Sequence, residues 1–191
     1  LKGVKTLTPV QPSKIIAVGL NYGDHAREAG MALPKEPLFW LKAPTSLIPD
    51  GAKIEIPFAN HRNDFEAELA VFIGRKMRNV TPAAAARYIF GYTAAQDITD
   101  RTIQASESQF ARSKSFDTFT PLGPYIETKI DPHDLSIQLF QNGQLRQNGN
   151  TSLTTPPEII AALRHEGFTF GLDACADEHN YRVSPWLSGP H

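Results

Sequence analysis

Two acidic residues, Glu66 and Glu68, stand two positions apart in the segment FEAELAVFI, residues 65–73. Alternate side chains of a β-strand point to the same face, so a strand here would project both carboxylates together. Neighbouring carboxylates repel each other and lose solvation when they are buried, unless a cation lies between them. Carboxylate oxygens are hard ligands that favour Mg²⁺, Mn²⁺ or Ca²⁺ over zinc. The spacing therefore predicts a divalent-cation site, and the alternative is an exposed strand face with two surface acids.

Three further residues extend this chemistry. Asp97 follows the extended run GYTAAQ and is by composition the natural third ligand, although an aspartate at a strand end is also a common turn residue. His25 and Glu28 are three positions apart on a predicted helix and so share a face. A carboxylate beside a histidine orients the imidazole and raises its basicity, which favours a general base. The alternative is a surface histidine beside a surface glutamate.

The elements that position these groups must be short, because 15 prolines and 13 glycines are spread through the chain. Apolar runs predict strands at 14–18, 38–41, 54–56, 65–73 and 91–98. Helices are predicted at 21–29, from Thr81-Pro82 to just before Gly91, and at 156–164. Asn142-Gly143, between two alternating runs, predicts a type I′ hairpin. We therefore expect an α+β fold that is mostly β, with three short helices.

Composition limits the class of protein. The 191 residues are enough for one domain with a core, and 41% hydrophobic with 20% charged residues is typical of a globular chain. A net charge of −1 gives no electrostatic reason to expect nucleic acid or an anionic membrane as a partner. The single cysteine excludes an internal disulfide, and the first twelve residues lack the apolar core of a signal peptide. We expect a cytoplasmic location.

Several segments together resemble the fumarylacetoacetate hydrolase family. VGLNYGDHAREAG is similar to its lid helix and NDFEAELAVFIGRKMRNV to its metal-binding strand. FGYTAAQDITDRTIQ, RSKSFDTFTPLGP and DPHDLSIQLFQNGQLRQNGNTS resemble the segments that follow, in the same order. The resemblance covers about residues 14–170 and implies a mixed β-sandwich or roll with a few short helices. We expect a catalytic domain over residues 1–170, an unmatched tail over 171–191, and hence a fold that is incomplete at the C-terminus.

The resemblance also implies roles for particular residues. The metal, Mg²⁺ or Mn²⁺ with Ca²⁺ as a further option, would be held by Glu66, Glu68 and Asp97. The catalytic residues would be His25, Glu28 and Lys114, and the substrate-binding residues Arg101 and Gln104. The family often forms homodimers and acts on small 2-oxo acids.

The activity that we expect from this resemblance is hydrolysis of a carbon–carbon bond in an acylpyruvate or fumarylacetoacetate-like acid, through a metal-stabilised enolate. The same enolate supports decarboxylation, or isomerisation of a related 2-hydroxy-dienoate acid in aromatic catabolism. A catalytically inactive metabolite-binding relative and a β-rich scaffold with surface acids are further alternatives. Outside the matched site residues, Lys42 follows an apolar strand and could reach the cleft, but we favour its interpretation as a snorkelling surface lysine. We interpret His61 as a surface or turn residue.

Overall fold

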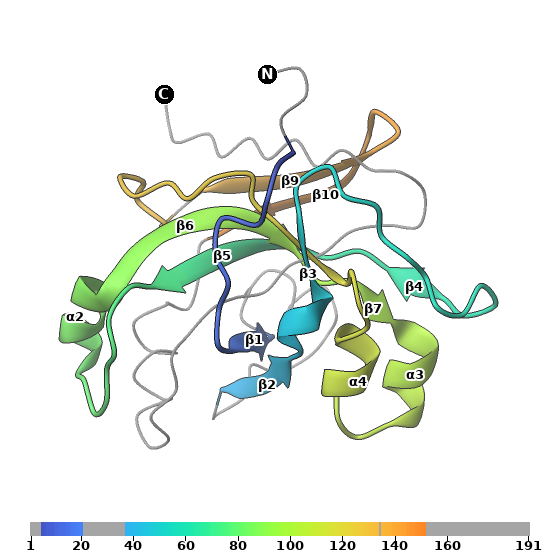
Figure 1. Ribbon diagram of the computed structural model, residues 1–191, viewed down its shortest axis with the longest axis horizontal. Coiled ribbons are helices and arrows are strands. Elements are labelled where there is room, and N and C mark those ends of the chain that lie inside the picture. The colour runs from blue at the N-terminus through green and yellow to red at the C-terminus, as the bar shows by residue number, and fades with distance from the viewer. Residues whose placement is uncertain (1–4, 21–36, 134, 152–191) are drawn as a thin grey trace.

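The computed structural model describes residues 5–20, 37–133 and 135–151, and within them the fold is mostly β, as predicted. Figure 1 shows two long curved strands, β5 (Ala67–Ile73) and β6 (Ile89–Gln96), across the middle of the molecule. They belong to a four-stranded sheet in the order β3-β8-β6-β5, which adds β3 (Leu47–Pro49) and β8 (Thr120–Leu122). β3 and β8 are parallel, and the other pairs are antiparallel.

Three two-stranded pairs surround this sheet. β1 (Ile15–Gly19) pairs with β2 (Leu38–Lys42), and β4 (Asn63–Asp64) pairs with β7 (Thr99–Asp100), both antiparallel. β9 (Ser136–Gln141) and β10 (Gln144–Asn150) form the hairpin predicted from Asn142-Gly143. Both turn residues have positive φ, 52° and 76°, as a type I′ turn requires.

The helices of the described residues are short. α2 (Pro82–Ala85) begins at the predicted proline, but a 3-10 turn (Ala86–Tyr88) ends it earlier than expected. α3 (Arg101–Ser106) and α4 (Ala111–Lys114) were not predicted, and they lie together beside β7 in Figure 1. The predicted helices at 21–29 and 156–164 lie outside the described residues, as does the expected tail, 171–191. No helix in the described part of the chain is long and apolar enough to cross a membrane.

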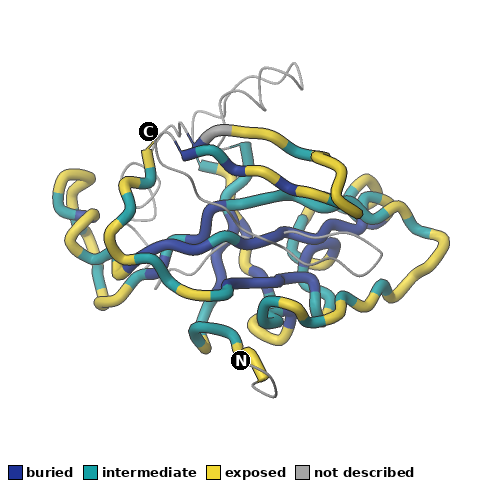
Figure 2. Tube along the Cα trace, turned by 90° about the horizontal axis from the view of Figure 1, so that it is seen from above, coloured by how far each residue is buried: buried dark blue, intermediate teal, exposed yellow. Residues whose placement is uncertain are grey.

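The core lies on both faces of the central sheet. One cluster consists of Ala70, Phe72, Ala95 and Leu122, and a second joins Leu69 and Tyr92 of the sheet to Leu135. In Figure 2 the buried part of the trace follows the central strands, while the peripheral loops are exposed.

The prediction of a strand at 54–56 was wrong. Ile54 and Ile56 are half-buried against a third cluster, formed by Ile98 and Phe119, but this segment forms no strand. The alternation of apolar and polar residues here reflects packing of Ile54 and Ile56 on that cluster, and the segment pairs with no strand.

Candidate active site

One end of the β5–β6 pair places two acidic residues side by side. Glu66 immediately precedes β5 and Asp97 immediately follows β6, and the Asp97 amide donates a hydrogen bond to the Glu66 carbonyl at 3.0 Å. The antiparallel register therefore brings together two carboxylates that are 31 positions apart in the sequence (97 − 66). As predicted, Asp97 follows the end of a strand.

Lys114, at the end of α4, joins these two carboxylates. Its ammonium donates to Glu66 Oε2 at 2.8 Å, to Thr99 Oγ1 at 2.8 Å, and to Asp97 Oδ2. The Lys114 side chain is only 3% exposed, whereas that of Glu66 is 23% exposed. The arrangement is a buried ammonium with one carboxylate that still reaches solvent.

A second lysine, Lys42, meets Asp97 from β2. Its ammonium donates to Asp97 Oδ1 and, at 3.3 Å, to the Phe119 carbonyl, and both side chains of the Lys42–Asp97 pair are fully buried. The interpretation of Lys42 as a surface lysine was wrong, because its buried partner lies 55 residues further along the chain. The sequence held one signal for this burial, namely that Lys42 ends an apolar strand.

These two cations determine the charge state of Asp97. Burial raises the pKa of its carboxyl, but the charges and hydrogen bonds of Lys114 and Lys42 outweigh burial and hold the pKa below its ordinary value of 3.8. Asp97 is therefore an ionised, fully buried carboxylate.

Arg101 closes the other side of Glu66. It lies at the first position of α3 and forms an ion pair with Glu66 Oε1, while its Nε donates to Asp64 Oδ2 at 2.8 Å. Its Nη1 donates to Gln104 Oε1 at 2.8 Å, so the two predicted substrate-binding residues are in direct contact. Burial lowers the pKa of Arg101, but Glu66 and Asp64 outweigh this effect and raise it.

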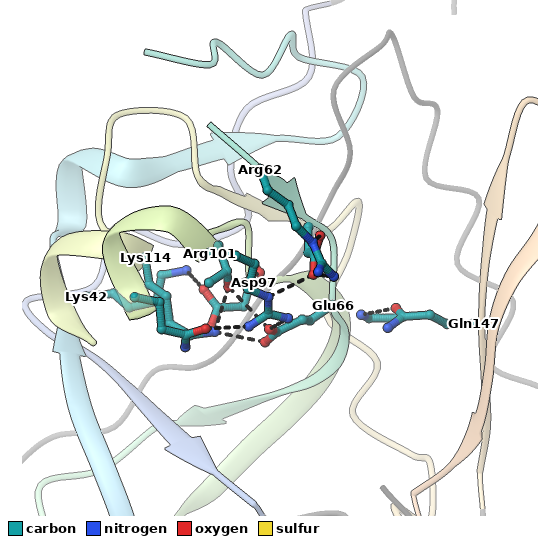
Figure 3. A network of polar contacts seen from close by, with 11 residues as sticks. Lys42, Arg62, Glu66, Asp97, Arg101, Lys114 and Gln147 are labelled. Atoms are coloured by element: carbon teal, nitrogen blue, oxygen red, sulfur yellow. Dashed lines mark hydrogen bonds and ion pairs between the residues drawn. The ribbon is translucent and has the colours of Figure 1, made fainter. Parts of the chain in front are cut away.

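Figure 3 shows these side chains arriving from separate segments of the chain. The cations come from β2, α3 and α4, and the carboxylates come from the ends of β5 and β6. Gln147 of β10 lies at the edge of the cluster, where its Oε1 accepts from the Ala67 amide at 2.7 Å. The result is a compact, charge-compensated cluster.

The predicted metal ligands can be compared with this geometry. Glu66 and Asp97 both accept from one ammonium, so their oxygens converge on a point that takes positive charge, and these oxygens suit Mg²⁺ or Mn²⁺. Glu68 lies on β5 opposite Ala95. Three acids or histidines are not gathered as a metal cluster anywhere in the described part of the chain. The chemistry of Glu66 and Asp97 suits a divalent cation, and the assignment of Glu66, Glu68 and Asp97 as its ligands stays a prediction.

Two further predictions concern histidines. His25 and Glu28, the predicted catalytic pair, lie outside the described residues. His61, interpreted as a surface or turn residue, has a side chain that is 21% exposed, and its Nδ1 lies 2.6 Å from Asp100 Oδ2. The other oxygen of Asp100 accepts from the Ile103 amide at 2.9 Å and caps α3. His61 thus supports the helix that carries Arg101.

Comparison with known proteins connects this geometry to a family. The family model "Fumarylacetoacetate (FAA) hydrolase C-terminal" matches residues 14–170. An uncharacterized protein of Archaeoglobus fulgidus is 51% identical over 152 residues, which are 80% of this chain and 61% of that protein. The mitochondrial oxaloacetate tautomerase of Xenopus laevis is 41% identical over 155 residues, 78% of this chain and 49% of that enzyme.

A solved structure shows the same fold. The crystal structure of 5-carboxymethyl-2-hydroxymuconate delta-isomerase from Mycobacterium smegmatis has a TM-score of 0.81 and 37% sequence identity to this chain. The match covers 90% of this chain and 70% of that one. Several relatives are therefore longer than the stretch they share with this chain.

Proposed function

The chain belongs to the fumarylacetoacetate hydrolase family, and we propose that it is a divalent-metal-dependent enzyme that hydrolyses a carbon–carbon bond in a small 2-oxo acid. The observation that carries the proposal is the convergence of Glu66 and Asp97 on a single buried ammonium, that of Lys114. A pair of carboxylates among several fixed cations is a place to bind an anionic ligand together with a metal. Because the chain spans only 61% of the Archaeoglobus fulgidus relative, the activity of the whole protein is part of this proposal.

The cation would be held by Glu66 and Asp97, with Glu68 as the expected third ligand. Mg²⁺ or Mn²⁺, if held there, would supply Lewis acidity for the negative charge that develops during carbon–carbon cleavage. Lys42 keeps Asp97 ionised and fixed, since the two side chains are a fully buried ion pair. A carboxylate that ligates a metal must be ionised and held in position, and Asp97 is both.

The substrate would be held by the remaining cations. The Arg101 side chain is 30% exposed, and its guanidinium is oriented by Asp64 and Gln104. A guanidinium held in this way can donate to a substrate carboxylate in a fixed geometry. Lys114 adds positive charge where negative charge develops, and because it is buried and already oriented, little reorganisation is needed.

Hydrolysis also needs a base. By the family resemblance His25, oriented by Glu28, takes a proton from water, and the water oxygen attacks the carbonyl carbon of the bond to be cleaved. The bonding electrons then pass to the 2-oxo acid fragment as its enolate, which is protonated to the product.

A second candidate is isomerisation or tautomerisation of a 2-oxo acid at the same site. The relatives that favour it are the delta-isomerase of Mycobacterium smegmatis and the oxaloacetate tautomerase of Xenopus laevis. Here the base moves a proton between carbon and oxygen, or between two carbons, and no water attacks. The two candidates share Arg101, Lys114 and the metal ligands, and differ in whether water enters.

The binding test is thermal unfolding of the full chain with and without Mg²⁺ plus oxalate, a planar dianion that resembles the enolate of pyruvate. At 100 times its dissociation constant, a ligand of the folded state should stabilise the protein by about 2.7 kcal/mol. Glu66→Gln should abolish this gain. The matched control, Glu55→Gln, changes an exposed glutamate and should keep it.

Turnover separates the candidate functions. Cleavage of an acylpyruvate into two acids supports hydrolysis, and accelerated enol–keto exchange of oxaloacetate without cleavage supports the second candidate. Oxalate binding without turnover of either substrate would identify an inactive metabolite-binding relative. No stabilisation by Mg²⁺ plus oxalate in a folded protein would refute the proposed site.

A further inference from the structure

Trp40 shares the inner face of β2 with Lys42. Both side chains are buried, whereas Phe39, before Trp40, and Leu41, between the two, are exposed. This is the alternation of a strand that is covered on one side. Since Lys42 reaches Asp97 from that face, Trp40 is directed toward the same cluster.

The indole of Trp40 lies against Lys114, the predicted catalytic lysine. The Lys114 ammonium is 5.1 Å from the ring centroid, and the Phe110 ring meets the indole edge-on at 5.3 Å. On the other side the indole packs on Gly19, where a Cβ atom would lie 2.9 Å from Trp40 Cζ3. This contact involves the six-membered ring of the indole, which does not carry the N–H group.

That N–H group has no acceptor in the part of the chain that the structure describes. Trp40 Nε1 is buried and makes no hydrogen bond in the structure over its described residues. An indole N–H can only donate, and buried tryptophans normally find an acceptor. A buried donor without a partner costs about 1–3 kcal/mol, so its retention calls for an explanation. Lys114 cannot satisfy it, because an ammonium is also only a donor.

We propose that Trp40 is a substrate-binding residue, whose indole N–H donates to a carboxylate or keto oxygen of the small 2-oxo acid held beside Lys114. This inference rests on the proposed function and deepens it. An anion at this place would be attracted by the nearby ammonium and would accept from the indole N–H, which has no partner among the described residues. Phenylalanine at this position would keep the aromatic face for Lys114 but would lack the donor.

The consequence is selectivity for the ligand. A site with a buried donor rejects an analogue that lacks the matching oxygen, because the donor then stays unpaired. Trp40 would therefore discriminate between small acids that have an oxygen at this point and those that have a methylene there.

Indole N–H resonances test the proposal directly in the full chain. The protein contains two tryptophans, Trp40 and Trp186, so ¹⁵N-labelled indoles give two signals, which Trp186→Phe assigns. On titration with Mg²⁺ and oxalate, the Trp40 indole proton should move downfield, as a new hydrogen bond requires. Trp40→Phe should weaken oxalate binding about tenfold, the equivalent of one hydrogen bond, and Trp186→Phe should leave it unchanged.

The outcomes separate this inference from the proposed function. If wild-type protein binds oxalate with Mg²⁺ while the Trp40 signal stays in place and Trp40→Phe binds as tightly, Trp40 is not a ligand-binding residue and the proposed function stands. If the wild-type protein binds no oxalate at all, both are overturned. Should Trp40→Phe fail to fold, the shift of the wild-type Trp40 signal still decides.

Discussion

Replacing Lys42 by methionine removes one of the two ammonium groups that hold the buried carboxylate of Asp97. Breaking a buried ion pair by removing one partner typically costs about 3–5 kcal/mol, because the remaining charge is left uncompensated. Asp97 keeps Lys114, so we expect the lower end of that range, about 3 kcal/mol. For a chain of this size the melting temperature should fall by roughly 6–12 °C. Since folded domains are stable by about 5–15 kcal/mol, the variant should remain folded at 25 °C.

Urea unfolding at pH 7 with a chelator present is the assay, so that bound metal does not contribute. Lys53→Met is the matched control, because Lys53 is exposed, and its unfolding free energy should change by less than about 0.5 kcal/mol. The double variant Lys42→Met, Asp97→Asn should be more stable than Lys42→Met alone, since it removes the uncompensated carboxylate. A Lys42→Met variant as stable as the wild type would refute the reasoning, because the pair could not then be buried as described.

Three further expectations concern packing, capping and pH. Gly91→Ala should destabilise the protein by about 1–3 kcal/mol, because the new Cβ would lie 2.7 Å from the Glu127 carbonyl oxygen. The control Gly149→Ala, whose new Cβ would lie 3.5 Å from Ile137 Cγ2, should be nearly neutral in the same urea assay. Asp100→Ala removes the cap of α3 and should cost about 1–2 kcal/mol, with greater hydrogen exchange at the start of that helix. Burial raises the pKa of Asp64, but its two arginine partners outweigh this and hold it below 3.8, so its contribution to stability is present above pH 3.8 and is lost as the pH falls through the folded-state pKa. Asp64→Asn should therefore weaken the acid dependence of the unfolding free energy below pH 3.8, and an unchanged dependence would count against the pairing.

Local sequence signals were sufficient where the structure depends on local geometry. The hairpin at Asn142-Gly143 follows from two residues that accept positive φ, and the end of β6 before Asp97 follows from the apolar run. The mostly β class follows from the short apolar segments. Each of these features needs only neighbouring residues.

The errors arose where distant segments decide the outcome. Ile54 and Ile56 alternate like a strand but pack on the cluster of Ile98 and Phe119 without a pairing partner. α3 has no apolar face of sufficient length to be predicted, and depends on Asp100, which was a readable N-cap signal that went unused. A lysine at a strand end is ordinarily at the surface, and only the fold shows that Lys42 meets a carboxylate.

The same cluster must stabilise the fold and bind ligands, and the burial of its two carboxylates divides these tasks. Asp97 is fully buried between two ammonium groups that come from β2 and α4, so it ties these segments to the central sheet, and its loss would disturb the structure as well as the chemistry. Glu66 is 23% exposed, and its partners Lys114 and Arg101 keep Asp97 and Asp64 when it is neutralised. Because solvent reaches Glu66, its ion pairs are screened more than the fully buried pair of Lys42 and Asp97. Substitution of Glu66 is therefore the change that reports on ligand binding with the least effect on folding, whereas a loss of activity on substitution of Asp97 would have two causes that no turnover assay can separate.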